Sequence, residues 1–253
     1  MFIILGLSVL IILLFAWFFK DTFEMVVYGE EGVKRVLSEQ LISIDDGIKG
    51  CVDKESLSSI KTLLANGGTF NLINPINYDT DQDGIYGEKV RVLCSNIVNN
   101  EMCLNSPVLK RDLEKELEVK LGDSIKICSA NVINGIKSNN YEVEEGDFNL
   151  KVDIESKNVL FNINYPLNIS RKGISTYKED FSSSVEFPLN SMVEVINHNL
   201  NAEALGEEAG FDDYSLNRGC KVISETVGNY KVYEIQNWDY EEYPFWFAVE
   251  GGS

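Results

Sequence analysis

The sequence has few of the residue types on which enzyme chemistry and nucleic-acid binding depend. It contains one histidine, His198, and it lacks a Cys-x-x-Cys pair and a glycine-rich phosphate loop. With 22 basic against 40 acidic residues, the net charge of -18 repels phosphate backbones and anionic lipid headgroups. No Ser-His-Asp set can be assembled around His198. We therefore expect no catalytic activity, no zinc or dithiol redox site and no nucleic-acid partner.

Charge is absent from residues 1–19, in which Ser8 is the only polar side chain. As a helix this segment would be about 28 Å long, close to the ~30 Å thickness of a bilayer core. A basic region ahead of the apolar run and a small-residue cleavage site are both missing, since bulky Trp17, Phe18 and Phe19 end the run. We expect the segment to be retained and to insert in a membrane, with the remaining chain outside the cell.

Proline is absent before Pro75, and apolar residues continue beyond Lys20 at steps of mostly three or four. This spacing predicts an amphipathic helix. Gly29 and Gly32 weaken it locally, by roughly 1 kcal/mol each relative to alanine. We therefore predict a single long helix over residues 1–50, apolar on every side in its first half and on one face in its second.

This layout resembles the type IV pilin superfamily, including archaeal pilins, over residues 1–50. In that family the hydrophobic half of the helix first sits in the membrane and later packs in a filament core, while the other half holds a globular head. Bacterial pilins usually carry glutamate at the fifth mature position, where this chain has Leu5, and archaeal pilins commonly lack it. Without a basic leader, Met1 would have to be the mature first residue. The resemblance implies assembly through seven apolar residues, Phe2, Leu5, Leu10, Leu13, Leu14, Phe15 and Phe18.

The favoured function is therefore a structural subunit of an extracellular pilus-like filament for adhesion or surface attachment. An apolar helix that leaves lipid must bury every face, and neighbouring copies supply the cover. The expected partners are copies of the same chain in a helical homopolymer, the membrane before assembly, and an unidentified surface target. The alternative is a single-pass, membrane-anchored extracellular binding, adhesin or envelope-assembly protein that does not polymerise.

Five cysteines follow the apolar segment, which suits an oxidising exterior with two disulfides and one remaining thiol. The alternative is five reduced thiols in a reducing compartment. Cys94 and Cys103 enclose a short polar loop and form the first expected pair. Asn168 begins an Asn-Ile-Ser glycosylation sequon, which also fits an external protein.

Two similar segments suggest the second disulfide. Residues 33–51 and 109–128 are both amphipathic helical patterns that end in Asp-x-Ile-Lys-x-Cys, as after an ancient duplication. If the two helices pack side by side, Cys51 and Cys128 are neighbours. Cys220 is then the spare thiol, or it replaces one of them.

An acidic segment offers the one candidate metal site. Residues 79–88 place carboxylates at alternate positions ahead of Gly84, like the first half of an EF-hand or dockerin-type Ca²⁺ loop. The twelfth position holds Val90 instead of glutamate, so Glu88 would substitute in a shorter loop. The alternative is an acidic turn between strands. The predicted Ca²⁺ ligands are Asp79, Asp81, Asp83, the backbone carbonyl of Ile85, and Glu88.

The rest of the chain predicts an α+β fold, with an antiparallel sheet against helices. Residues 51–253 would form an acidic extracellular head beyond the helix, with 51–145 and 146–253 as its two subregions. Alternation with a period of two predicts strands, and a three-to-four spacing predicts helices. The predicted elements are a short helix over 54–65, a helix opened by Pro107, a hairpin over 148–165, a helix opened by Pro188, a hairpin over 221–236 and a last strand over 243–249.

Overall fold

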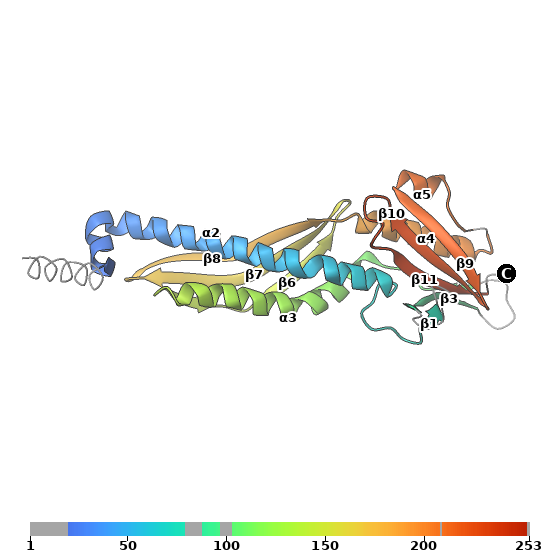
Figure 1. The fold of residues 1–253 in the computed structure, drawn as a ribbon, viewed down its shortest axis with the longest axis horizontal. Helices are drawn as coiled ribbons and strands as arrows, with labels where there is room; N and C mark the ends of the chain where they lie inside the picture. Colours follow the sequence, from blue (N-terminus) through green and yellow to red (C-terminus); the bar gives the residue numbers. More distant parts are fainter. Residues whose placement is uncertain (1–19, 79–87, 97–102, 208, 252–253) are drawn as a thin grey trace, which may run out of the picture.

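The structure is a computed structural model that describes residues 20–78, 88–96, 103–207 and 209–251. The molecule is elongated, with the N-terminal end of α2 (Lys20–Ala65) and strand β9 (Cys220–Val227) at opposite ends (Figure 1). We call one part the stem, which comprises α2 (Lys20–Ala65), α3 (Lys110–Lys137), β5 (Glu142–Glu145), β6 (Asn149–Ile154), β7 (Asn158–Arg171) and β8 (Ile174–Glu186).

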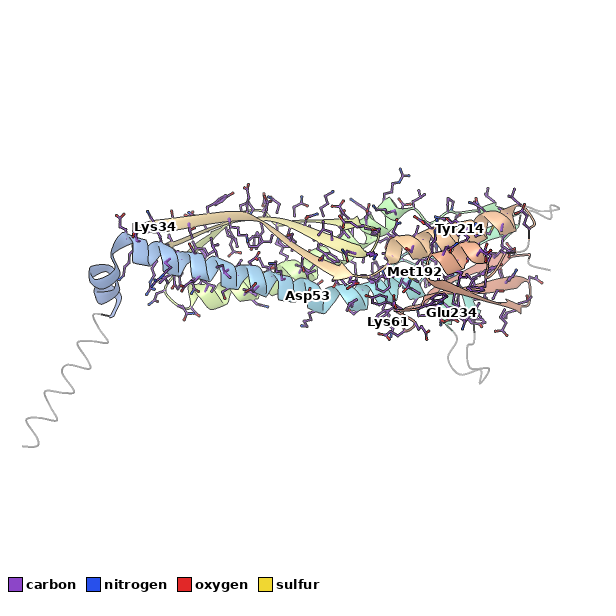
Figure 2. All side chains as sticks on the ribbon, turned by 90° about the horizontal axis from the view of Figure 1, so that it is seen from above. Lys34, Asp53, Lys61, Met192, Tyr214 and Glu234 are labelled. Atoms are coloured by element: carbon purple, nitrogen blue, oxygen red, sulfur yellow. A yellow bond between two sulfur atoms is a disulfide. The ribbon has the colours of Figure 1, made fainter. Side chains whose placement is uncertain are left out.

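The other part, the distal region, holds the remaining described elements. It comprises β1 (Ile76–Tyr78), β2 (Glu88–Val90), β3 (Val92–Asn96), β4 (Cys103–Asn105), α4 (Leu189–Ala204), α5 (Asp213–Asn217), β9 (Cys220–Val227), β10 (Tyr230–Asn237) and β11 (Phe245–Glu250). The chain passes between the two parts three times, after α2, after β4 and after β8. Lys34 lies near one end of the molecule, and Tyr214 and Glu234 near the other (Figure 2).

The N-terminal helix differs from the prediction at both ends. Helix α2 is broken at Gly29, whose φ of 62° and ψ of -170° are not helical. Such a conformation is open to glycine because it has no Cβ. The predicted single helix running without interruption through residues 1–50 is therefore wrong, and α2 instead continues past residue 50 to Ala65.

Within the described part of the chain, no helix combines the length and the apolar character that a membrane span requires.

The separate helix expected over residues 54–65 is also wrong, because these residues complete α2. The buried stripe continues through Val52, Ile60 and Leu63, all fully buried, so neither packing nor sequence ends the helix earlier. The predicted stop after Ala65 is confirmed. The amides of Gly67 and Gly68 donate to the last carbonyls of the helix at 3.0 and 2.8 Å.

Helix α3 lies antiparallel beside α2. Cys51 of α2 is joined to Cys128 of α3. Gly47, one turn before Cys51 in α2, faces Val132, one turn after Cys128 in α3. A Cβ on Gly47 would lie 2.6 Å from Cγ1 of Val132, so the glycine permits this close approach. Helix α3 buries every fourth residue: Leu113, Leu117, Leu121, Ile125, Ser129 and Ile133.

The two helices cover one face of the stem sheet. Strand β7 is central, with β8 along one edge and β6 followed by β5 along the other, all antiparallel. The register with β8 shifts between Asn164 and Leu167, at Pro166, which has no amide to donate to a ladder. The inner face of β7 carries buried Phe161, Ile163 and Ile169.

The outer face of the same sheet is polar. The side-chain amides of three asparagines on β7 donate to carboxylates of the neighbouring strands at 3.0–3.1 Å. An antiparallel sheet with one packed and one hydrated face is expected to alternate in this way. The three pairs are Asn162 with Asp153, Asn164 with Asp180, and Asn168 with Glu144.

The distal region is built on a five-stranded sheet in the order β4-β3-β11-β10-β9. Strands β3 and β11 are parallel, although Val92 and Ala248 lie far apart in sequence, and the other neighbours are antiparallel. Helix α4 packs on one face, against buried Tyr233 and Phe247. On the other face β1 and β2 add Tyr78 and Val90 to a second, smaller cluster.

Several local predictions are confirmed. Strands β6 and β7 form the first predicted hairpin, and β9 and β10 form the second across the two-residue turn Gly228-Asn229. Pro188 is the N-cap of α4, and β11 is the predicted last strand. Each of these elements has a regular periodicity over its own length, which explains why local sequence was sufficient to find it.

Candidate functional site

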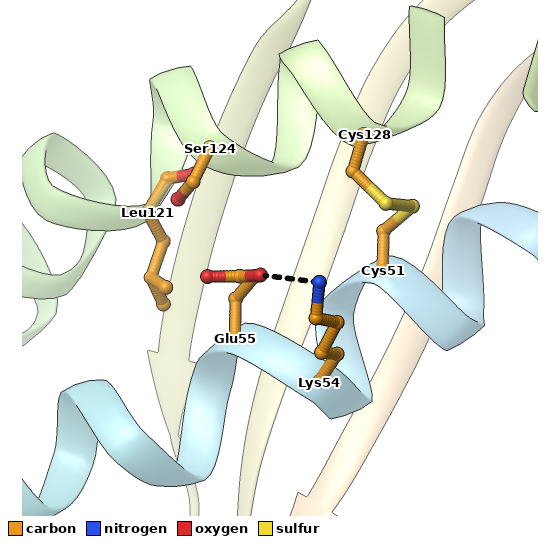
Figure 3. The surroundings of a disulfide bond; sticks show 6 residues. All are labelled: Cys51, Lys54, Glu55, Leu121, Ser124 and Cys128. Atoms are coloured by element: carbon orange, nitrogen blue, oxygen red, sulfur yellow. Dashed lines mark hydrogen bonds and ion pairs between the residues drawn. A yellow bond between two sulfur atoms is a disulfide. The ribbon is translucent and has the colours of Figure 1, made fainter. Parts of the chain in front are cut away.

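The two disulfides join the same cysteine pairs that the sequence favoured. Cys51 and Cys128 connect α2 to α3 with Cα atoms 5.8 Å apart, and Cys51 is buried (Figure 3). Cys94 and Cys103 connect β3 to β4 with Cα atoms 5.4 Å apart. The disulfides point to an oxidising, extracellular environment, because such bonds persist where thiols are not kept reduced.

Cys220 is the remaining cysteine, and its thiol is fully buried at the start of β9. Burial raises the pKa of the Cys220 thiol to about 11. The thiolate is the reactive form of cysteine. Cys220 is therefore a packing residue in the folded state and not a poised nucleophile.

A group of chemistry-bearing side chains lies where residues of α5 contact α4. Nε2 of His198 is 2.7 Å from Oδ2 of Asp212, the N-cap residue of α5. Oδ1 of the same carboxylate accepts from the amide and the hydroxyl of Ser215, each at 2.9 Å. Burial of Asp212 raises its pKa, but the hydrogen bonds from Ser215 and His198 together lower it by a larger amount, so the net shift of the pKa is downward.

This group contains serine, histidine and aspartate, but in the wrong order for nucleophilic catalysis. The hydroxyl of Ser215 donates to Asp212, whereas a catalytic serine donates to the histidine. The His198 ring also stacks on Tyr214, with centroids 4.3 Å apart. On the same helix, the Arg218 guanidinium lies 3.5 Å from the Tyr214 centroid and pairs with Glu194 of α4. The arrangement fastens α5 to α4.

Sequence reasoning singled out His198 but missed its partners. Asp212, Tyr214 and Arg218 come from the connection between α4 and β9, which has no regular periodicity. The one local signal was Asp212 with Ser215 three residues later, the spacing of an N-cap.

A second polar group lies where the stem meets the distal region. A cavity of about 340 Å³ there is lined by residues that include Arg91 and Glu116. Arg91 donates to the carbonyl of Gly67 at 3.2 Å, and Glu116 accepts from the amide of Phe70 at 2.8 Å. These contacts hold the loop after α2 against α3 and position the two parts of the molecule.

The predicted Ca²⁺ ligands Asp79, Asp81, Asp83 and Ile85 lie outside the described residues. The backbone of Glu88 is described and pairs with Tyr78 in the β1–β2 hairpin, so the ends of the predicted loop are adjacent. Among the residues that the structure describes, no group of three or more His, Cys, Asp and Glu side chains could hold a metal ion. The Ca²⁺ loop thus stays a prediction.

Two sequence predictions remain, the seven assembly residues and the glycosylation site. Phe2, Leu5, Leu10, Leu13, Leu14, Phe15 and Phe18 lie outside the described residues. Asn168 is half-buried in β7, paired with Glu144 on one side and Tyr177 on the other. Its Nδ2, the atom that a glycan would modify, donates to Glu144 at 3.0 Å.

Comparison of this chain with models of protein families, with curated proteins and with solved structures gave no match.

Proposed function

We propose that this protein is an extracellular surface protein, held at its N-terminal end, whose stem carries the distal region outward to bind a partner. The elongated shape carries this proposal, because the start of α2 and the distal region lie at opposite ends (Figure 1). Residues 30–65 alone, in α2 after its break, make a helix of about 54 Å. The stem is thus a spacer in which α3 packs along α2.

Four further observations support an exterior location and an attached N-terminus. Two disulfides suit an oxidising compartment. Residues 1–19 carry no charge and would provide the attachment, and the remaining chain is strongly acidic, which favours solubility. The polar outer face of the stem sheet is fitted to water.

A second candidate is the filament subunit. It is favoured by residues 1–19, which are apolar on every side and would need neighbouring copies for cover outside lipid. Its strongest sequence argument was a helix that continues without interruption from this segment. The break at Gly29 removes that argument, so the anchored surface protein is our first choice.

The location can be tested on intact cells that produce the full chain. A membrane-impermeant amine label should modify exposed lysines such as Lys54, while a cytoplasmic control protein stays unlabelled. Labelling of the full chain only after lysis would contradict the proposal.

The two candidates are separated by shearing the same cells and imaging the released material by negative-stain microscopy. Filaments that an antibody against this chain decorates would establish the second candidate. Surface labelling together with a chain that stays in the membrane fraction after shearing, without filaments, would establish the first.

A further inference from the structure

Most sheet edges among the described residues are protected against pairing with another chain. On β6, the amides of Val152 and Ile154 donate to Glu118 and Glu114 of α3, at 3.1 and 2.9 Å. Strand β8 is packed against α2. Strands β4 and β5 are only three and four residues long, and β5 is acidic. Soluble proteins use such short, charged or covered edges to prevent unwanted sheet extension.

Strand β9 is neither short nor covered over its second half. It has eight residues, and within the described part of the chain it pairs with β10 alone. From Ile223 to Val227 every residue is exposed, so both faces of this half-strand are open. Ile223 and Val227 are β-branched and apolar, with exposed fractions of 37% and 38%. Such a strand is suited to pair with another strand.

The sequence of β9 is complementary to itself in one antiparallel register. When Ile223 lies opposite Ile223 of a second copy, Lys221 lies opposite Glu225 twice, once on each side of the centre. Opposite charges and β-branched pairs at directly facing positions stabilise a sheet. Centring the pair on Glu225 would instead place two carboxylates together, and centring it on Ser224 would place Ile223 opposite Glu225.

A contact within the chain fixes the face of the sheet on which Glu225 lies. Its Oε2 accepts from the hydroxyl of Tyr78 at 2.7 Å, on the face of the sheet that β1 and β2 cover. Lys221, Ile223 and Glu225 share that face because strand side chains alternate.

We propose that β9 is the interface of a homodimer, in which two copies pair antiparallel with Ile223 at the two-fold axis. The contact is isologous and closes after two copies. It joins the two five-stranded sheets edge to edge into one continuous sheet. The interface lies in the distal region, at the other end of the molecule from the start of α2 (Figure 1).

The register is tested by cysteine crosslinking of the full chain in detergent. In an Ile223→Cys variant the two new thiols face each other within disulfide distance, and mild oxidation should produce a covalent dimer on non-reducing gels. Val227→Cys is the matched control on the same strand. Its two thiols would lie eight residues apart along the pair, or about 26 Å, so at least about tenfold less dimer should form. Equal crosslinking in both variants, or none in Ile223→Cys, would overturn the proposal.

Charge substitution tests the same contact without a covalent bond. Lys221→Glu places like charges opposite each other twice and should weaken the dimer roughly fivefold to thirtyfold in sedimentation equilibrium. Adding Glu225→Lys restores opposite charges, and the double variant should regain most of the affinity. Unchanged thermal melting would show that each variant still folds. A monomeric native chain, or a dimer insensitive to both substitutions, would refute the interface.

Discussion

The stem and the distal region both cover a sheet with helices, but they leave different parts of that sheet open. In the stem one face is bare and polar, and the edge of β6 is covered by glutamates from α3. In the distal region both faces carry other elements, and the edge of β9 is open. The stem therefore faces water along its sheet, whereas the distal region can extend its sheet with another strand.

The two disulfides differ in a parallel way. Cys51 and Cys128 are 77 residues apart and staple two long helices, whereas Cys94 and Cys103 are nine apart and join neighbouring strands. A crosslink restricts the unfolded chain more when it closes a longer loop. The stem is the more strongly constrained part, as a spacer requires.

The largest expected difference between the two regions comes from removing these disulfides. Replacing Cys51 and Cys128 by serine should reduce the free energy of unfolding by about 4.5 kcal/mol, and replacing Cys94 and Cys103 by about 2.5 kcal/mol. Urea unfolding of the full chain in detergent measures both changes. An equal or larger loss for the distal pair would contradict the comparison.

The close approach of the stem helices gives the next largest effect. Gly47→Ala places a methyl group 2.6 Å from Val132, and the overpacking should cost about 1–3 kcal/mol. Gly50→Ala, three residues later in the same helix and in open space, should instead stabilise by about 1 kcal/mol through helix propensity. Thermal melting compares the two variants.

A second substitution separates overpacking from other causes. Val132→Ala should restore most of the stability that Gly47→Ala removes, because it takes away the two clashing methyl groups. A Gly47→Ala variant as stable as Gly50→Ala would show that the helices have room to separate.

An ion pair between α2 and β8 predicts a smaller, pH-dependent effect in the stem. Burial raises the pKa of Asp45, but the hydrogen bonds from Lys49 and Lys178, at 2.7 and 2.9 Å, together lower it by a larger amount, so the net shift of the pKa is downward. A lowered carboxyl pKa stabilises the fold above the unfolded-state value of 3.8, and that contribution disappears as the pH falls through the folded-state value.

Asp45→Asn should therefore destabilise the protein by about 1 kcal/mol at pH 7, and by progressively less below pH 3.8. Unfolding of the two proteins across this range measures the difference. A difference in the free energy of unfolding that stays constant with pH would show that the loss comes from packing and not from the ion pair.

The smallest expected effect concerns Cys220 in the distal region. Its buried thiol has a pKa raised to about 11, so alkylation at pH 8 should be negligible in the folded protein. Subdenaturing urea should increase the labelling rate when β9 opens, whereas the loss of stem helix, measured by circular dichroism, should come only at higher urea concentrations. Rapid labelling without urea would show that β9 is not packed as described.

Several elements were predictable because their information is local. The apolar spacing of four residues in α3 and the alternation of β6 and β7 each extend over a whole element. Gly67 and Gly68 end α2 in a conformation that suits glycine. The disulfide between Cys51 and Cys128 was also accessible, since the two similar helices suggested neighbours. The candidate site was less predictable, because the partners of His198 lie in a segment without periodicity.

The sequence by itself determined the helical repeat of α3, the end of α2 after Ala65 and the two hairpins, since those patterns depend on neighbours two, three or four residues away. It did not determine the break at Gly29, because glycine permits that backbone conformation without requiring it. Only the tertiary structure decided that Val92 pairs with Ala248, that Gly47 meets Val132, and that the edge of β9 is open. These features depend on contacts between residues far apart in the sequence, and the spacing of apolar residues along the chain gives no information about such contacts.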